Sequence, residues 1–117
     1  MPDARRIFGN KSEDLAAKYL KNLGIKILER QFKTKIGEVD LIGKDGNEIV
    51  FVEVKARKSN EFGYPEESVT QKKLEKIARV AEQYLRLKKI EDQPFRIDVV
   101  AIEQIDKQNI ITYYKAV

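Results

Sequence analysis

Two carboxylates and one lysine occur in this sequence at a spacing that can bring them together on a β-hairpin. Glu53 and Lys55 are two residues apart, so their side chains project from the same face of an expected strand. Asp40 belongs to the preceding expected strand, and Asp45-Gly46-Asn47 between the two is typical of a tight turn. The pattern predicts two acids and a lysine side by side on one face of a sheet.

The central residues of the turn decide how Asp40 faces Glu53. If Gly46 and Asn47 are central, Asp40 lies directly opposite Glu53. If Asp45 and Gly46 are central, Asp40 is diagonal to Glu53 on the same face. Both registers bring the carboxylates together, with Cβ atoms about 5 Å apart when directly opposed. A loop of odd length would separate them.

Carboxylates this close repel each other unless one is protonated or a cation lies between them. The chain has no histidine and no cysteine, so its metal ligands would be oxygen atoms, which favours Mg²⁺ or Mn²⁺. We expect Asp40 and Glu53 to bind the ion, with the Val54 carbonyl and waters completing its shell. Lys55 is then placed to polarise an attacking water and to stabilise charge on a phosphoryl oxygen.

The alternative to this site is a surface charge network, in which Lys55 pairs across the hairpin with Glu38. Residues 49–54 are almost continuously apolar, which indicates a central strand. Burying charged groups on a central strand is unfavourable, so their presence there favours the functional interpretation.

Two further residues are candidates for the same site. Glu13 extends the apolar stripe of the first expected helix and can lean towards the sheet, or it completes a capping box with Asn10; the sequence favours neither. Lys73 lies at the edge of the buried face of the second expected helix. It either reaches a scissile phosphate or covers apolar surface with its stem, and the local sequence favours the second.

Other polar and aromatic residues are weaker candidates for the same chemistry. Three cations near Lys73 are placed to meet flanking phosphates or are simply a solvated face: Lys72, Lys76 and Arg79. Phe62 and Tyr64 are suited to stacking on bases, although pinning their loop to the core is the more economical interpretation. Asp98, within an apolar strand, is expected to have a structural hydrogen-bonding role.

Hydrophobic periodicity and turn residues predict seven elements around these residues. The expected helices are Lys11–Leu23, with Asn10 as N-cap and Gly24 after its end, and Val69–Lys89, with Ser68 and Gln71 at capping-box spacing. The expected strands are Ile25–Gln31, Gly37–Gly43, Glu48–Arg57, Phe95–Ile102 and Ile110–Tyr114. A right-handed crossover through the second helix makes the third and fourth strands parallel neighbours. The fold class is therefore α/β: a single domain over residues 1–117, with a central mixed β-sheet flanked by helices.

The composition of the chain restricts its class and its partners. The chain has 117 residues, 42% of them hydrophobic, which suits one globular domain. No apolar run is long enough to span a bilayer, and the first residues lack the apolar region of a signal peptide, so we expect a cytoplasmic protein. The formal net charge of +4 suits a polyanionic partner.

The runs Gly37–Ile42 (GEVDLI) and Val50–Arg57 (VFVEVKAR) are similar to those of the small YraN-like bacterial proteins. Through them the chain resembles the PD-(D/E)xK endonucleases, near the archaeal Holliday-junction resolvases, over residues 9–102. The resemblance implies an αβββαβ restriction-endonuclease-like core.

By the same resemblance, Asp40 and Glu53 correspond to metal ligands and Lys55 to the catalytic lysine. Glu13 matches the acid of the first helix in resolvase-like members, and Lys73 matches a basic position in the second helix. The implied activity is that of a Mg²⁺-dependent endonuclease acting on DNA, branched or otherwise structured, and a homodimer is expected by analogy. The alternatives are a non-catalytic nucleic-acid-binding module that retains the fold, and a protein-interaction scaffold.

Overall fold

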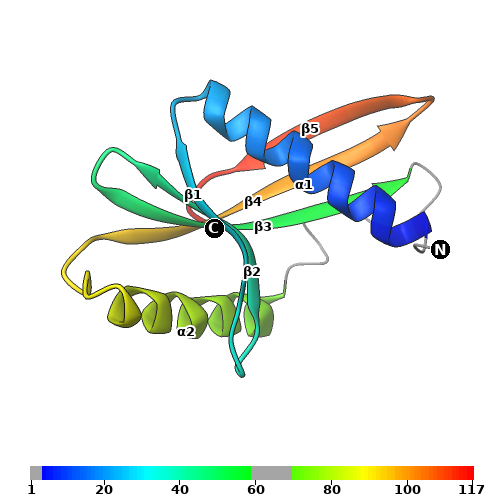
Figure 1. Ribbon diagram of the computed structural model, residues 1–117. Coiled ribbons are helices and arrows are strands. Elements are labelled where there is room, and N and C mark those ends of the chain that lie inside the picture. The colour runs from blue at the N-terminus through cyan, green and yellow to red at the C-terminus, as the bar shows by residue number, and fades with distance from the viewer. Residues whose placement is uncertain (1–3, 59–69) are drawn as a thin grey trace.

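The computed structural model describes residues 4–58 and 70–117, with side chains from residue 11 onward (Figure 1). Its elements, in chain order, are α1 (Ala4–Asn22), β1 (Lys26–Lys33), β2 (Glu38–Asp45), β3 (Glu48–Lys58), α2 (Gln71–Leu87), β4 (Phe95–Ile105) and β5 (Gln108–Tyr114). Within these residues, no helix combines the length and the apolar character needed to cross a membrane.

The five strands form one mixed sheet in the order β1-β2-β3-β4-β5. Neighbouring strands are antiparallel except β3 and β4, which are parallel and joined through α2. This confirms the predicted mixed sheet and the predicted crossover. The order of elements is consistent with a restriction-endonuclease-like core, to which β5 adds an antiparallel edge strand.

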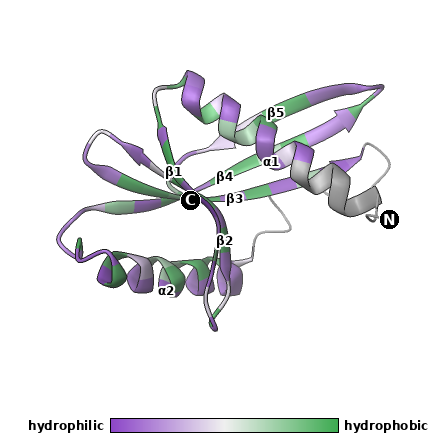
Figure 2. Cartoon of the chain, in the orientation of Figure 1, coloured by the Kyte–Doolittle hydropathy of each residue, from purple (hydrophilic) through white to green (hydrophobic). Residues whose placement is uncertain are grey.

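The central strand β3 separates two hydrophobic clusters. Val50 and Val52 pack with residues of α1, whereas Ile49 and Phe51 pack with residues of α2. Since successive side chains of a strand point to opposite faces, the two helices cover opposite faces of the sheet. In Figure 2 hydrophilic and hydrophobic residues alternate along α2, as expected of a helix with one buried face. Glu53 shares its parity with Phe51 and therefore faces the α2 side.

The first helix ends as predicted but begins earlier. Gly24 has φ +92°, its N–H donates to the Lys21 carbonyl at 3.0 Å, and the Ile25 N–H donates to the Leu20 carbonyl at 3.0 Å. This is a Schellman motif, which uses glycine after the last helical residue. The predicted start at Lys11 is wrong: α1 begins at Ala4, so Asn10 lies inside the helix and is not its N-cap. Residues 4–6 include alanine and two arginines, which are good helix formers and extend the helix past the asparagine.

The second helix is shorter than predicted at both ends. Its N-cap is Thr70, whose Oγ1 accepts a hydrogen bond from the Lys73 N–H at 3.1 Å. The predicted cap Ser68 and start Val69 lie outside the described residues. The helix ends at Leu87 because Lys89 has φ +59°, which is not helical.

The last hairpin was only partly anticipated. β4 continues to Ile105 and β5 starts at Gln108, and these two residues pair across a two-residue turn. The turn residues Asp106 and Lys107 have φ values of +48° and +66°. Both residues of a type I′ turn need positive φ, and without glycine the sequence Asp-Lys gave no clear signal for it.

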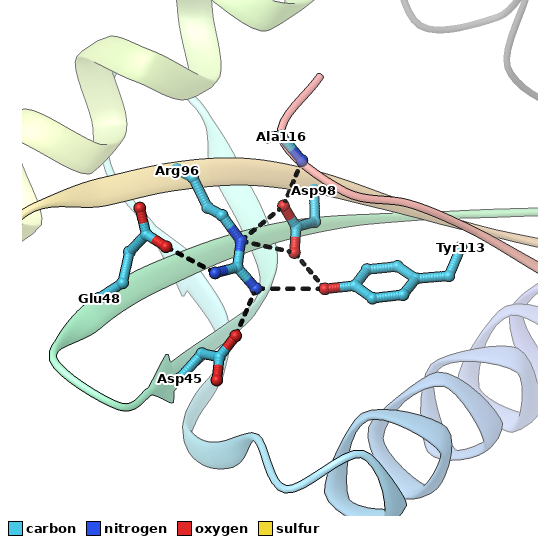
Figure 3. Close-up of polar contacts among 6 residues, drawn as sticks. All are labelled: Asp45, Glu48, Arg96, Asp98, Tyr113 and Ala116. Atoms are coloured by element: carbon cyan, nitrogen blue, oxygen red, sulfur yellow. Dashed lines mark hydrogen bonds and ion pairs between the residues drawn. The ribbon is translucent and has the colours of Figure 1, made fainter.

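One buried arginine joins the hairpin end of the sheet to the end of the chain (Figure 3). The Arg96 side chain is 8% exposed and donates to Asp98 at 3.1 Å and to Glu48 at 2.6 Å. It also donates to Asp45 and to the hydroxyl of Tyr113. The fully buried Asp98 additionally accepts hydrogen bonds from the Tyr113 hydroxyl and from the Ala116 N–H. The structural role expected for Asp98 is confirmed.

Removal of the Asp98 carboxylate should therefore destabilise the fold. Asp98→Ala removes one partner of the buried Arg96 and leaves the Tyr113 hydroxyl and the Ala116 N–H without their acceptor. Breaking a buried ion pair in this way costs about 3–5 kcal/mol. Glu48→Ala is the matched control, because the Glu48 side chain is 36% exposed and its pair with Arg96 should contribute no more than about 1 kcal/mol. Urea denaturation measures both, and equal losses in the two variants would contradict this ranking.

Candidate functional site

The site lies where β2 and β3 separate. Their ladder runs from Asp45 opposite Glu48 to Leu41 opposite Val52, and the next pair in this register is Asp40 with Glu53. Gly46, with φ +62°, is the first of the two central turn residues. Of the two registers considered from the sequence, the directly opposed one is therefore correct.

Asp40 interrupts the ladder with its own side chain. Its Oδ2 accepts a hydrogen bond from the Val54 N–H at 2.8 Å, where a continued ladder would bring the main chain of Val39. Val39 itself packs in the α2-side cluster, although Leu41, two residues later, packs in the α1-side cluster. Strict alternation thus breaks at Asp40, and the break holds its carboxylate against the backbone of β3.

Glu53 is 6% exposed and is contacted by two lysines from different elements. Its Oε1 lies 2.8 Å from the Lys73 Nζ of α2 and 3.5 Å from the Lys55 Nζ of β3. Lys55 pairs with Glu53 and not with Glu38, because the β2–β3 ladder ends at Leu41 and Val52 before it reaches Glu38. The Lys73 side chain therefore reaches the site, contrary to the local interpretation that it only covers apolar surface.

The charges of the site perturb one another. Burial and the neighbouring charge of Glu53 raise the pKa of Asp40 from 3.8 to about 7, against the lowering effect of the Val54 hydrogen bond. Burial and the adjacent Lys73 lower the pKa of Lys55. Burial acts to lower the pKa of Lys73, but its hydrogen bond to Glu53, its contact with Lys55 and the negative charges of Glu53 and Asp40 together outweigh burial and raise the pKa. Two acids and two ammonium groups thus share one poorly solvated region.

Glu13 projects from α1 towards β1 and is 7% exposed. Its carboxylate accepts hydrogen bonds from the Arg30 Nε at 3.0 Å and the Gln31 Nε2 at 3.3 Å. Its negative charge contributes to the raised pKa of Asp40, so it belongs to the same electrostatic region. The capping-box alternative is wrong, because Asn10 is not at the helix start.

Arg30 and Gln31 were missed by sequence reasoning. Their only signal was three consecutive polar residues, 29–31, in a strand otherwise marked by apolar positions. Gln31 has φ +53°, a conformation that the sequence gave no reason to expect.

The remaining candidates lie outside this cluster. Lys72, Lys76 and Arg79 are exposed on α2, and Asp98 belongs to the Arg96 network. Phe62 and Tyr64 lie outside the described residues.

The carboxylate oxygens of the site suit a hard divalent cation that takes only one or two ligands from the protein and the rest from water. Within the described part of the chain, no group of three or more Asp, Glu, His or Cys side chains is arranged to hold a metal. Mg²⁺ is commonly bound through one or two carboxylates and several waters. Asp40 and Glu53 supply two carboxylates, and their coupling, visible in the raised pKa of Asp40, is the repulsion that a cation would relieve.

Residues 12–102 of the chain match the family described as uncharacterised protein family UPF0102. The chain belongs to this family. A UPF0102 protein of Caldicellulosiruptor saccharolyticus is 44% identical over 107 residues, covering 92% of this chain and 91% of the relative. A UPF0102 protein of Thermodesulfovibrio yellowstonii is 48% identical over 99 residues, covering 85% and 88%.

A third relative, a UPF0102 protein of Clostridioides difficile, is 44% identical over 100 residues, covering 86% of this chain and 88% of its own length. The region shared with the UPF0102 family includes all the candidate side chains, from Glu13 in α1 to Lys73 in α2. The candidate site thus lies within the residues that match the family.

The raised pKa of Asp40 predicts a pH-dependent stability. A carboxyl whose folded pKa lies above its unfolded value stabilises the fold fully at low pH, and this contribution is lost as pH rises through the folded value, here about 7. Asp40→Asn keeps the acceptor for Val54 without the charge. Without divalent ions, the variant should exceed wild type in unfolding free energy at pH 8, by up to roughly 4 kcal/mol, and lose this advantage near pH 4.

Chemical denaturation across this pH range measures the difference. Asp92→Asn is the matched control, because Asp92 is exposed. A difference between Asp40→Asn and wild type that does not change with pH would contradict the assigned pKa.

Proposed function

We propose that this protein is a Mg²⁺- or Mn²⁺-dependent endonuclease that hydrolyses phosphodiester bonds in DNA, with branched or otherwise structured DNA as its substrate. The observation that carries the proposal is Glu53, a buried carboxylate held by Lys73 at 2.8 Å and Lys55 at 3.5 Å beside Asp40. An arrangement of two acids and a lysine on neighbouring strands is the one that the PD-(D/E)xK resemblance implies.

The carboxylates of Asp40 and Glu53, with the Val54 carbonyl, would hold the ion. When bound, the ion supplies Lewis-acid stabilisation of the phosphoryl oxygens and lowers the pKa of a coordinated water. Asp40 already has one oxygen fixed by the Val54 N–H, which sets the orientation of its carboxylate without any ligand. This preorganisation reduces the cost of assembling the site.

Lys55 would stabilise the charge that develops on the phosphoryl oxygen. Its ammonium group lies 3.5 Å from Glu53 and its side chain is 24% exposed, so it is held near the carboxylates yet reachable from outside. A positive charge in a poorly solvated site interacts more strongly with a developing anion than it would in water. Glu53 keeps the group in position.

Lys73 would have a second role at the same carboxylate. It is the closer partner of Glu53, and its side chain is 36% exposed. An ammonium group at this edge of the site is placed to bind a phosphate of the substrate once Glu53 has another positive partner. Glu13, fixed by Arg30 and Gln31, would add negative charge that favours cation binding.

Site variants test the catalytic assignment. Lys55→Ala and Glu53→Gln should lower Mg²⁺-dependent cleavage by about 100-fold or more, the effect typical of a lost charge-stabilising group. The loss in Lys55→Ala should fall on turnover more than on DNA affinity, because the lysine acts on the transition state. Glutamine is chosen at position 53 because it keeps the size of the side chain and an oxygen that can accept hydrogen bonds from the two ammonium groups, whereas alanine would remove both. Lys26→Ala, at an exposed lysine, is the control.

The assay compares branched, flapped, single-stranded and linear duplex DNA, each with Mg²⁺, Mn²⁺ or EDTA. Cleavage by both site variants at the wild-type rate would show that the assigned site is wrong. A wild-type protein that binds branched DNA and cuts none of the substrates would instead be the non-catalytic binding module.

Metal binding is tested separately by calorimetric titration. Mn²⁺ should bind the wild-type protein and bind Asp40→Asn at least about tenfold more weakly, because one charged oxygen ligand is replaced by a neutral amide oxygen. Asp92→Asn should bind as wild type does. Equal affinity in wild type and Asp40→Asn would remove Asp40 from the set of ligands.

A further inference from the structure

Five exposed cations from two separate elements form what we call the basic surface. They come from the end of β1 and the turn that follows it, and from one side of α2: Lys33, Lys35, Lys72, Lys76 and Arg79. In the described part of the chain, none of the five forms an ion pair. Within these residues their charges remain available to an external anion; Lys33 lies opposite the exposed Glu38 in the β1–β2 ladder without forming an ion pair with it.

The turn between β1 and β2 is fixed by its own hydrogen bonds. The Thr34 N–H donates to the Gly37 carbonyl at 2.8 Å, and the Thr34 Oγ1 accepts from the N–H groups of Ile36 and Gly37 at 3.1 and 3.2 Å. Lys33 and Lys35 flank Thr34 in this turn. Their backbone positions are thus held, which lowers the entropy lost when a ligand binds.

The turn also packs directly on α2. A Cβ atom placed on Gly37 would lie 3.1 Å from the Lys76 Cδ and 3.8 Å from the Val80 Cγ2, so the stem of Lys76 lies over this glycine. Figure 1 shows the tip of the β1–β2 hairpin beside the N-terminal half of α2. The β1–β2 turn and this side of α2 are therefore in direct contact, which brings the backbone positions of the two groups of cations close together.

The acids of α2 lie on the far side of these cations. With 3.6 residues per turn, Arg79, Lys72 and Lys76 fall within an arc of about 60°. Glu75 and Glu82 lie on the flank of this arc away from Lys76, whose stem contacts the turn. The helix thus presents positive charge towards the turn and negative charge away from it.

The basic surface adjoins the candidate site along both of its elements. Lys76 is three residues, about one helical turn, after Lys73, which contacts Glu53. Asp40 is three residues after Gly37 on β2. A ligand bound on the surface would therefore extend towards the carboxylates.

We propose that the basic surface binds the phosphodiester backbone of duplex DNA next to the bond that is cut. The inference rests on the proposed function, which it extends by placing the arm of the substrate along α2 and the β1–β2 turn. Lys72 and Arg79 are about 10 Å apart along the helix axis, which matches roughly three nucleotides of one strand at 3.4 Å each. Contacts of this kind neutralise phosphates and do not read base sequence.

Salt-dependent DNA binding in EDTA tests this placement without any cleavage. The helix variant is Lys72→Gln/Lys76→Gln/Arg79→Gln, and the turn variant is Lys33→Gln/Lys35→Gln. The control variant, Lys18→Gln/Lys21→Gln/Lys26→Gln, removes three exposed charges from α1 and the start of β1. Wild type, these three variants and Asp40→Asn are each titrated into labelled duplex and branched DNA at several salt concentrations.

Each lost phosphate contact should reduce the slope of log K against log salt by about 0.9. The helix variant should therefore lose about 2–3 from the slope and the turn variant about 2, while the control keeps the wild-type slope. Asp40→Asn should bind with the wild-type slope, because it lies outside the basic surface.

The outcomes separate the two proposals. Wild-type slopes in the helix and turn variants, or an equal loss in the control, would overturn the basic surface even if the protein cleaves DNA. The expected slopes in a protein that cleaves nothing would support the basic surface and overturn the proposed endonuclease.

Discussion

The position of every side chain in the candidate site follows from the register of the hairpin between β2 and β3. With Asp45 opposite Glu48, Asp40 comes next to Glu53, whose side chain faces α2. A shift of one residue would turn the side chains of a strand to the other face, so that one carboxylate would enter the α1-side core. Burial of Val50 and Val52 on the α1 side opposes such a shift, because the apolar side chains would lose their packing.

This register places like charges together in a poorly solvated region, and the protein tolerates it in two ways. Asp40 is held by the Val54 N–H and has a pKa raised to about 7, so it is partly protonated near neutral pH. Glu53 forms ion pairs with Lys73 and Lys55. Carboxylates that are desolvated and mutually repelling reduce stability, and such groups are concentrated at functional sites. The Arg96 network, by contrast, satisfies its buried charges fully at the other end of the hairpin.

The sequence was sufficient to predict the mixed sheet, the parallel pairing of β3 with β4, and the meeting of Asp40 with Glu53, because apolar periodicity and the Gly46 turn carry that information locally. It was not sufficient for the start of α1 or for the turn at Asp106 and Lys107, where propensities differ by little. The clamp of Arg30 and Gln31 on Glu13, and the contact of Lys73 with Glu53, depend on how elements far apart in the chain pack. Such tertiary contacts have no periodic signature.

We propose that Asp40 and Glu53 form one cation site, in which the ammonium group of Lys73 is the positive partner of Glu53 when no metal ion is bound. A crystal structure with Mn²⁺, located by its anomalous scattering, tests this most directly. We expect a peak between the two carboxylates, within about 2.0–2.3 Å of an oxygen of each, and a Lys73 Nζ that has moved from its 2.8 Å contact with Glu53. A peak elsewhere on the protein, with the Glu53–Lys73 pair unchanged, would contradict it.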